Sequence, residues 1–237
     1  MRPLIAGNWK MHGDMSWIEK PRDFAKAMPA EERKHLDILI CPPSLFIAPM
    51  VATCFEANIQ LGAQNCHAAE SGAHTGDISA EMVKSAGADY VIVGHSERRA
   101  GGEADADVAA KAIAAAKQGL TPIICVGESL DVRKAGDAEE VVTAQIKASV
   151  PKDISDYVLA YEPIWAIGTG MTATADDIKA MHAVIRDLVG PKVRILYGGS
   201  VKPANANEIL GTENVNGALI GGASLEMESL AAIARAA

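Results

Sequence analysis

Apolar residues along this chain gather in short runs at nearly regular intervals. The runs of strand length cover residues 3–6, 37–41, 59–63, 90–93, 122–126, 157–160, 193–197 and 218–220. Within each run the apolar residues are almost continuous, which is typical of parallel strands buried on both faces. The pattern therefore predicts eight parallel strands, each about 30 residues from the next, as in a chain of βα units.

Alanine-rich segments lie between these runs and have the spacing of amphipathic helices. The clearest of them cover residues 105–118, 138–149, 175–188 and 225–236. Thr174, followed by Ala-Asp-Asp, predicts a capping box at the start of the third segment, and Ser79 and Ser224 occupy similar N-cap positions. Glycines that follow helices predict C-caps at Gly87, Gly119 and Gly190.

Strand-like and helix-like segments alternate over the whole chain of 237 residues, and no low-complexity linker divides it. Eight βα units in one domain, residues 1–237, predict an α/β fold of the (β/α)8 barrel type, with a doubly wound open sheet as the alternative. In a barrel, polar residues just after each strand gather on one face, where barrel enzymes keep their active sites.

Composition narrows the class of protein. Hydrophobic residues make up 49% and charged residues 22%, which supports a large core and excludes general disorder. The formal net charge of −8 argues against nucleic acid or an anionic membrane as the main partner. The first residues have no signal-peptide pattern, and the four cysteines lack metal-binding spacing. We therefore expect a cytoplasmic protein with reduced thiols and no metal.

One segment, residues 160–170, combines a carboxylate with a candidate flap. Glu162 ends the sixth predicted strand, and Pro163 and Trp165 follow it, so the start of the flap is stiff. Gly168 and Gly170 then allow a close approach of the backbone to a small ligand. A base followed by a lid is the pattern expected where chemistry must exclude water, although a surface loop with a solvated glutamate is the simpler alternative.

Polar residues follow several of the other strands. They are Asn8 and Lys10 after the first strand, His95, Ser96 and Glu97 after the fourth, and the glycine-rich turns Gly198-Gly199-Ser200 and Gly221-Gly222 after the seventh and eighth. Glycine-rich turns that open helices bind anions, and the last two βα loops of a barrel are the usual phosphate position. Taken alone, His95 is interpreted as a polar residue at the end of a strand, and Lys10 as a surface lysine. Because both lie on the same predicted face of the barrel, we interpret them instead as parts of one site.

A carboxylate and an imidazole that face one small anion suggest proton transfer, with the carboxylate as base and the imidazole as a hydrogen-bond donor to oxygen. The chain has no serine elbow, metal-ligand cluster or dinucleotide fingerprint.

The chain resembles the triosephosphate isomerases over residues 6–224. The resemblance rests on Gly7-Asn8-Trp9-Lys10-Met11, Gly62-Ala63-Gln64-Asn65, Gly94-His95-Ser96-Glu97-Arg98-Arg99, Cys125-Val126-Gly127-Glu128, the segment 160–170, Tyr197-Gly198-Gly199-Ser200-Val201 and Gly221-Gly222-Ala223-Ser224. The His-Ser-Glu-Arg-Arg and Tyr-Glu-Pro-x-Trp blocks are highly specific to that family in this order. The resemblance implies a TIM barrel and a cofactor-free isomerase of glycolysis and gluconeogenesis that interconverts dihydroxyacetone phosphate and D-glyceraldehyde 3-phosphate.

The resemblance also assigns roles to residues. It implies Glu162 as the proton-transferring base, neutral His95 as the group that polarises the carbonyl, Lys10 as the cation that stabilises the enediolate, and Asn8 as a contact to the substrate oxygen. The phosphate-gripping positions it implies are Gly168, Ser200, Gly221 and Gly222. Glu97 is expected to support His95 and Lys10, and Cys125 to pack near the base.

A long loop, residues 64–79, follows the third strand. In the family this loop inserts into a twofold-related partner with Thr75 near the neighbouring active site, so we expect a homodimer; the alternative is a monomer with a flexible loop. Arg98, Arg99 and Glu103 are expected to brace loops or an interface.

Two features depart from the family pattern, and two other functions compete with the one that the resemblance implies. Met171 stands where a lysine is frequent, and residues 100–103 form a short segment without a bulky side chain. Neither removes a catalytic group. The competing functions are another phosphosugar barrel enzyme, which would need a Schiff-base lysine or metal ligands, and a non-catalytic phosphate-binding or scaffold protein that has lost catalytic residues.

Overall fold

The chain folds into a closed barrel of eight parallel strands in sequential order. The computed structural model describes residues 1–167 and 171–237. The strands are β1 (Leu4–Asn8), β2 (Asp37–Cys41), β3 (Gln60–Ala63), β4 (Tyr90–Val93), β5 (Thr121–Val126), β6 (Val158–Tyr161), β7 (Arg194–Tyr197) and β8 (Gly217–Ile220). β1 closes the barrel because Leu4 is in register with Asp37 of β2 on one side and with Gly217 of β8 on the other. The open-sheet alternative is therefore wrong.

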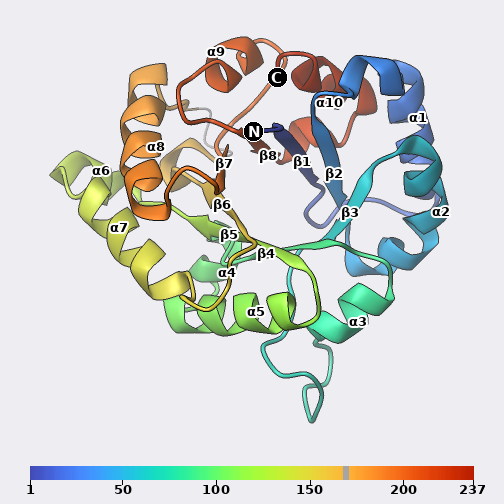
Figure 1. The fold of residues 1–237 in the computed structure, drawn as a ribbon, viewed down its shortest axis with the longest axis horizontal. Helices are drawn as coiled ribbons and strands as arrows, with labels where there is room; N and C mark the ends of the chain where they lie inside the picture. Colours follow the sequence, from blue (N-terminus) through green and yellow to red (C-terminus); the bar gives the residue numbers. More distant parts are fainter. Residues whose placement is uncertain (168–170) are drawn as a thin grey trace.

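Helices surround the strands on the outside (Figure 1). The α-helices are α1 (Lys20–Ala27), α2 (Ile47–Ala57), α3 (Ala80–Ser85), α4 (Ser96–Ala100), α5 (Asp105–Lys117), α6 (Leu130–Ala135), α7 (Ala138–Ser149), α8 (Ala175–Val189), α9 (Ala206–Leu210) and α10 (Met227–Ala234). Short 3₁₀ helices are η1 (Met15–Glu19), η2 (Ala30–Arg33), η3 (Ser44–Phe46), η4 (Ile164–Ala166) and η5 (Gly222–Ser224). The loop of residues 64–79, between β3 and α3, projects away from this ring.

Two separate apolar clusters form the core, and together they define which strand residues point inward. The larger cluster joins strand residues such as Ile5 and Ile38 to helix residues such as Phe24, so it lies between strands and helices. The smaller cluster contains strand residues only: Leu4, Ala6, Leu39, Cys41, Tyr90, Ile92, Ile123, Cys125, Val158, Ala160, Leu196 and Leu219. This smaller cluster therefore fills the barrel interior. Because side chains alternate along a strand, the residue two positions after the last interior residue of a strand also points inward.

The helix boundaries confirm most of the capping predictions. Thr174 and Asp177 form a capping box at the start of α8, and Ser79 accepts a hydrogen bond from the Met82 N–H. The prediction for Ser224 is wrong. Its hydroxyl donates to the Gly221 carbonyl inside η5, and α10 begins only at Met227, because the Gly-Gly turn first enters a 3₁₀ helix.

Among the described residues, no helix is both long enough and apolar enough to cross a bilayer.

Candidate active site

A cavity of about 220 Å³ opens at the carboxyl ends of the strands. Its lining brings together most of the residues that the sequence singled out: Asn8, Lys10, His95, Glu162, Ser200, Gly221 and Gly222. These residues come from five different βα connections, so only the closed barrel makes them neighbours. Gly168, the remaining predicted phosphate contact, lies outside the described residues.

Glu162 is aimed into the barrel mouth by the alternation of β6. Val158 and Ala160 are interior residues, and Glu162 follows them by the same step of two. Its side chain is buried, and its Oε2 accepts a hydrogen bond from the Ser96 N–H at 2.9 Å. Space for this carboxylate depends on Gly198, where a Cβ atom would lie 2.7 Å from Glu162 Cγ.

The surroundings of Glu162 change its acidity. Burial, and to a smaller extent the charge of Glu97, raise the pKa of its carboxyl above the ordinary value, against the lowering effects of His95, the Ser96 N–H and Lys10. A raised pKa makes the carboxylate a stronger base, so its driving force for taking a proton at neutral pH increases.

His95 stands at the N-cap of α4, and this position defines the tautomer of its ring. The Glu97 N–H donates to His95 Nδ1 at 3.2 Å, so Nδ1 carries a lone pair. The ring proton of the neutral imidazole is then on Nε2, which lies 3.0 Å from Glu162 Oε1. The imidazole and the carboxylate are therefore direct neighbours in the wall of the cavity.

Lys10 has an unusual backbone that turns its side chain into the site. Its φ of 52° is in the left-handed region, and Asn8 Oδ1 stabilises that turn by accepting the Lys10 N–H at 3.0 Å. Gln64 Nε2 donates to the Lys10 carbonyl at 2.8 Å. Gln64 has no predicted role in the sequence, although its position directly after β3 is the one signal that points to it.

The ammonium group of Lys10 pairs with Glu97. Lys10 Nζ lies 2.5 Å from Glu97 Oε1. Partial burial raises the pKa of the Glu97 carboxyl, but Lys10 and His95 outweigh it and hold the pKa below the ordinary value. Glu97 is thus ionised beside both groups that it was expected to support.

The second glycine-rich turn, Gly221-Gly222, lies on the Lys10 side of the cavity. Gly221 packs against Lys10, since a Cβ atom there would lie 3.3 Å from Lys10 Cε, whereas a Cβ at Gly222 meets nothing within 4 Å. Gly222 also begins η5, and the first N–H groups of a helix have no partner within it. Together with Ser200 these groups form a concave, donor-rich wall that suits an oxyanion.

The two ends of the predicted flap are anchored to the barrel. At the first end, Trp165 Nε1 donates to Glu128 Oε1 at 2.9 Å, and Ile167 lines the cavity. At the second end, Ala173 is buried and its backbone forms a hydrogen bond with the Tyr197 hydroxyl. Between them, Met171 is exposed.

Other predicted residues lie outside the cavity. Cys125 is fully buried beside Glu162, and burial raises the pKa of its thiol well above the ordinary value, so the thiol stays protonated at neutral pH. Arg99 braces the loop before His95, because its Nε donates to the Gly94 carbonyl at 2.8 Å and its Nη1 pairs with Asp105. Glu103 forms a buried ion pair with Lys111.

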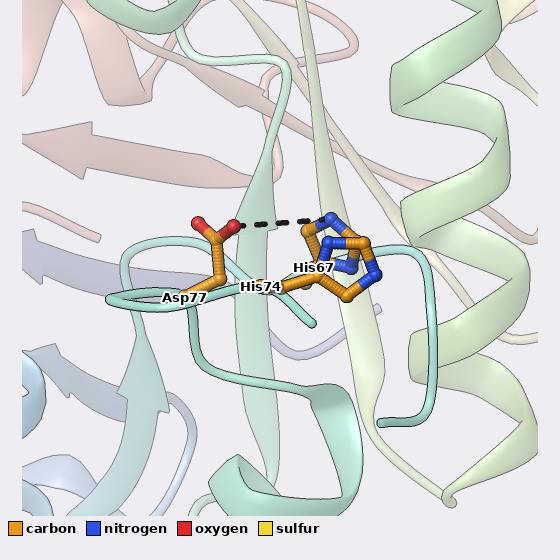
Figure 2. A group of neighbouring side chains, drawn as sticks. All are labelled: His67, His74 and Asp77. Carbon is orange, nitrogen blue, oxygen red and sulfur yellow. Dashed lines mark ion pairs between the residues drawn. The ribbon is translucent and has the colours of Figure 1, made fainter. Parts of the chain in front are cut away.

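A second group of polar side chains lies on the loop 64–79, where His67, His74 and Asp77 meet (Figure 2). The Ala69 N–H donates to His67 Nδ1, so the proton of the neutral ring is on Nε2, 3.9 Å from Asp77 Oδ2. The ligand atoms of a tetrahedral zinc ion lie only about 3.4 Å from one another. A histidine binds zinc through a ring nitrogen that carries no proton. In this arrangement His67 does not fit as a metal ligand.

Known proteins of one family are similar to this chain over its whole length. A family model described as triosephosphate isomerase matches residues 3–237. The triosephosphate isomerase of Afipia carboxidovorans is 53% identical, over 100% of this chain and 98% of that protein. That of Granulibacter bethesdensis is 51% identical, over 100% and 99%. The crystal structure of triosephosphate isomerase from Bartonella henselae superposes with a TM-score of 0.91 at 43% identity, covering 100% of this chain and 99% of that one.

Proposed function

The chain belongs to the triosephosphate isomerase family, and we propose from this premise how its residues interconvert dihydroxyacetone phosphate and D-glyceraldehyde 3-phosphate. The reaction moves one proton between adjacent carbons through an enediolate. It needs a base near both carbons, donors near both oxygens, and a hold on the phosphate. The site supplies one candidate for each requirement.

Glu162 is the proposed base. Its carboxylate takes the proton from one substrate carbon, and the electron pair of that C–H bond forms the enediolate; Glu162 then returns the proton to the neighbouring carbon. The observation that carries this assignment is the buried carboxylate held at 3.0 Å from His95 Nε2 and 2.9 Å from the Ser96 N–H. Burial raises its pKa, and its fixed position avoids a search for the reactive geometry.

His95 and Lys10 are the proposed electrostatic partners of the enediolate. The Nε2–H of neutral His95 donates to the substrate oxygens, and Lys10 stabilises the negative charge that develops on them. Asn8, at the end of β1, helps to place the substrate oxygen. The pairing of a carboxylate base with a neutral imidazole is the family's own well-known mechanism and is not a new assignment.

The phosphate is proposed to bind against Ser200, Gly221 and Gly222, with Gly168 of the flap as a further contact. Remote binding energy of this kind is available to close residues 163–173 over the reacting carbons. Closure excludes water, strengthens the electrostatic contacts and protects the enediolate from losing phosphate.

We further propose that the chain is one domain and acts as a homodimer in the cytoplasm, in glycolysis and gluconeogenesis. The projecting loop 64–79, with Thr75 exposed, supports the dimer, because so long an exposed loop is otherwise uncommon. Sedimentation from micromolar to nanomolar concentration tests this proposal; a fully active monomer would contradict it.

The assignment of Glu162 is tested with a coupled assay on D-glyceraldehyde 3-phosphate. Glu162→Gln and Glu162→Asp should still bind phosphate but lose about 10²–10⁴-fold in kcat, the usual contribution of a positioned general base. Normal turnover in either variant would refute the assignment.

A further inference from the structure

One guanidinium group on α6 contacts groups at both ends of the flap. Arg133 Nη2 donates to Asp177 Oδ1 at 2.5 Å, and Asp177 belongs to the first turn of α8. Arg133 Nη1 lies 3.8 Å from Glu128 Oε1, and its Cζ lies 5.6 Å from the ring centroid of Trp165. None of these contacts reaches the substrate cavity, so the mechanism above does not use them.

The contacts at the first end converge on Glu128. Its carboxylate is buried, and its Oε1 accepts hydrogen bonds from Trp165 Nε1 at 2.9 Å and from the Tyr161 hydroxyl at 3.1 Å. Its backbone carbonyl accepts the Ile164 N–H at 3.1 Å. A buried carboxylate needs a nearby cation, and Arg133 is the cation in its ion-pair range among the described residues.

At the second end of the flap, the two carboxylate oxygens of Asp177 have different partners. Oδ2 accepts the Thr174 N–H at 3.1 Å and the Thr174 hydroxyl at 2.7 Å, which completes the capping box of α8. Oδ1 is left for Arg133. The capping residue that ends the flap is therefore connected to α6 through a single carboxylate.

From these contacts we propose that Arg133 is a positioning residue that couples the two ends of the flap. Its planar fork fixes the spacing between Trp165 and Thr174, so a displacement at one end changes the contacts at the other. The inference rests on the function proposed above, since it takes the flap to act when the phosphate binds. Its expected effect is on how well the enediolate is retained, through the positions of Trp165 and of Ile167 in the cavity wall.

The test compares Arg133→Met with Lys134→Met, which removes an exposed positive charge from the neighbouring residue of α6. Two products are followed: the isomer, and methylglyoxal, which forms when the enediolate breaks its C–O bond to phosphate and releases inorganic phosphate. We expect Arg133→Met to lower kcat/KM for D-glyceraldehyde 3-phosphate about tenfold, as expected for loss of a charged hydrogen bond, and to raise the methylglyoxal fraction. Lys134→Met should match the parent.

D-glyceraldehyde, which has no phosphate to hold the flap, separates positioning from a general structural defect. Its slow proton exchange in deuterated water, followed by NMR, should be unchanged in Arg133→Met. An equal loss with both substrates, or no loss with either, would overturn the proposal.

If Arg133→Met does not fold, Arg133→Lys takes its place, because lysine keeps the positive charge but lacks the planar guanidinium. It should also lose activity on D-glyceraldehyde 3-phosphate and keep the proton exchange of D-glyceraldehyde. A parent enzyme that does not isomerise the phosphorylated substrate would refute the proposed function instead, so the two failures are distinguishable.

Discussion

Both ends of the barrel place charged side chains on the interior faces of strands, but the surroundings of these charges differ between the two ends. At the carboxyl ends of the strands, the column of β6 finishes with Glu162, whose ionised form is disfavoured by burial. At the amino ends, β7 begins with Arg194, which pairs with Asp37 Oδ2 at 2.8 Å and donates to the Tyr90 hydroxyl at 2.9 Å. Arg2 adds a second contact to Asp37 at 3.0 Å.

The difference separates catalysis from stability within one fold. Opposite charges and hydrogen bonds satisfy the groups at the amino ends. At the carboxyl ends, an open cavity and a base of raised pKa remain, which costs stability and provides reactivity. Substitutions at the two ends should therefore have opposite signatures.

Among the substitutions that compare the two ends of the barrel, the largest effect is expected for Gly198→Ala. The new Cβ atom would lie 2.7 Å from Glu162 Cγ and 3.2 Å from the Tyr161 carbonyl, so the carboxylate must move. A displacement of about 1 Å at a reacting group costs up to about 10²-fold in rate. Steady-state kinetics should show the loss in kcat, while inorganic phosphate still inhibits; an unchanged kcat would mean that Gly198 does not set the position of the base.

Arg194→Met should show the reverse signature. It leaves Asp37 with Arg2 alone and the Tyr90 hydroxyl without its donor, so we expect the free energy of unfolding to fall by about 1–3 kcal/mol. Urea denaturation measures this change, and kcat of the folded enzyme should equal that of the parent. A large loss of kcat with a normal free energy of unfolding would contradict the claim that the amino ends of the strands serve stability and the carboxyl ends serve catalysis.

A smaller effect is expected on how the free energy of unfolding changes with pH, and it comes from the raised pKa of Glu162. Because its folded pKa exceeds its unfolded value, the stability that its protonation contributes is fully present below about pH 4.3 and is lost as pH rises through the folded pKa. The stability of the parent relative to Glu162→Gln should therefore decrease as pH rises over that window. Denaturation curves at several pH values test this; the opposite slope would mean that the pKa of Glu162 is lowered.

Features that depend on neighbouring residues could be predicted from the sequence, whereas features that depend on contacts between distant segments could not. The strands followed from local apolar runs, and Glu162 followed from its place just after the sixth run and before a segment with proline and glycine. The role of Arg133 did not, because its partners Glu128 and Asp177 come from two other segments that only the fold brings together. Ser224 was assigned wrongly because a local cap pattern cannot show that a 3₁₀ turn precedes the helix.

The central claim is that the barrel mouth holds Glu162 as a base of raised pKa. A ¹³C NMR titration of the unliganded enzyme labelled at the glutamate carboxyl carbon tests this directly, with Glu162→Gln identifying the signal. The account predicts that the Glu162 signal titrates above the ordinary glutamate pKa of about 4.3. A midpoint at or below that value would contradict it.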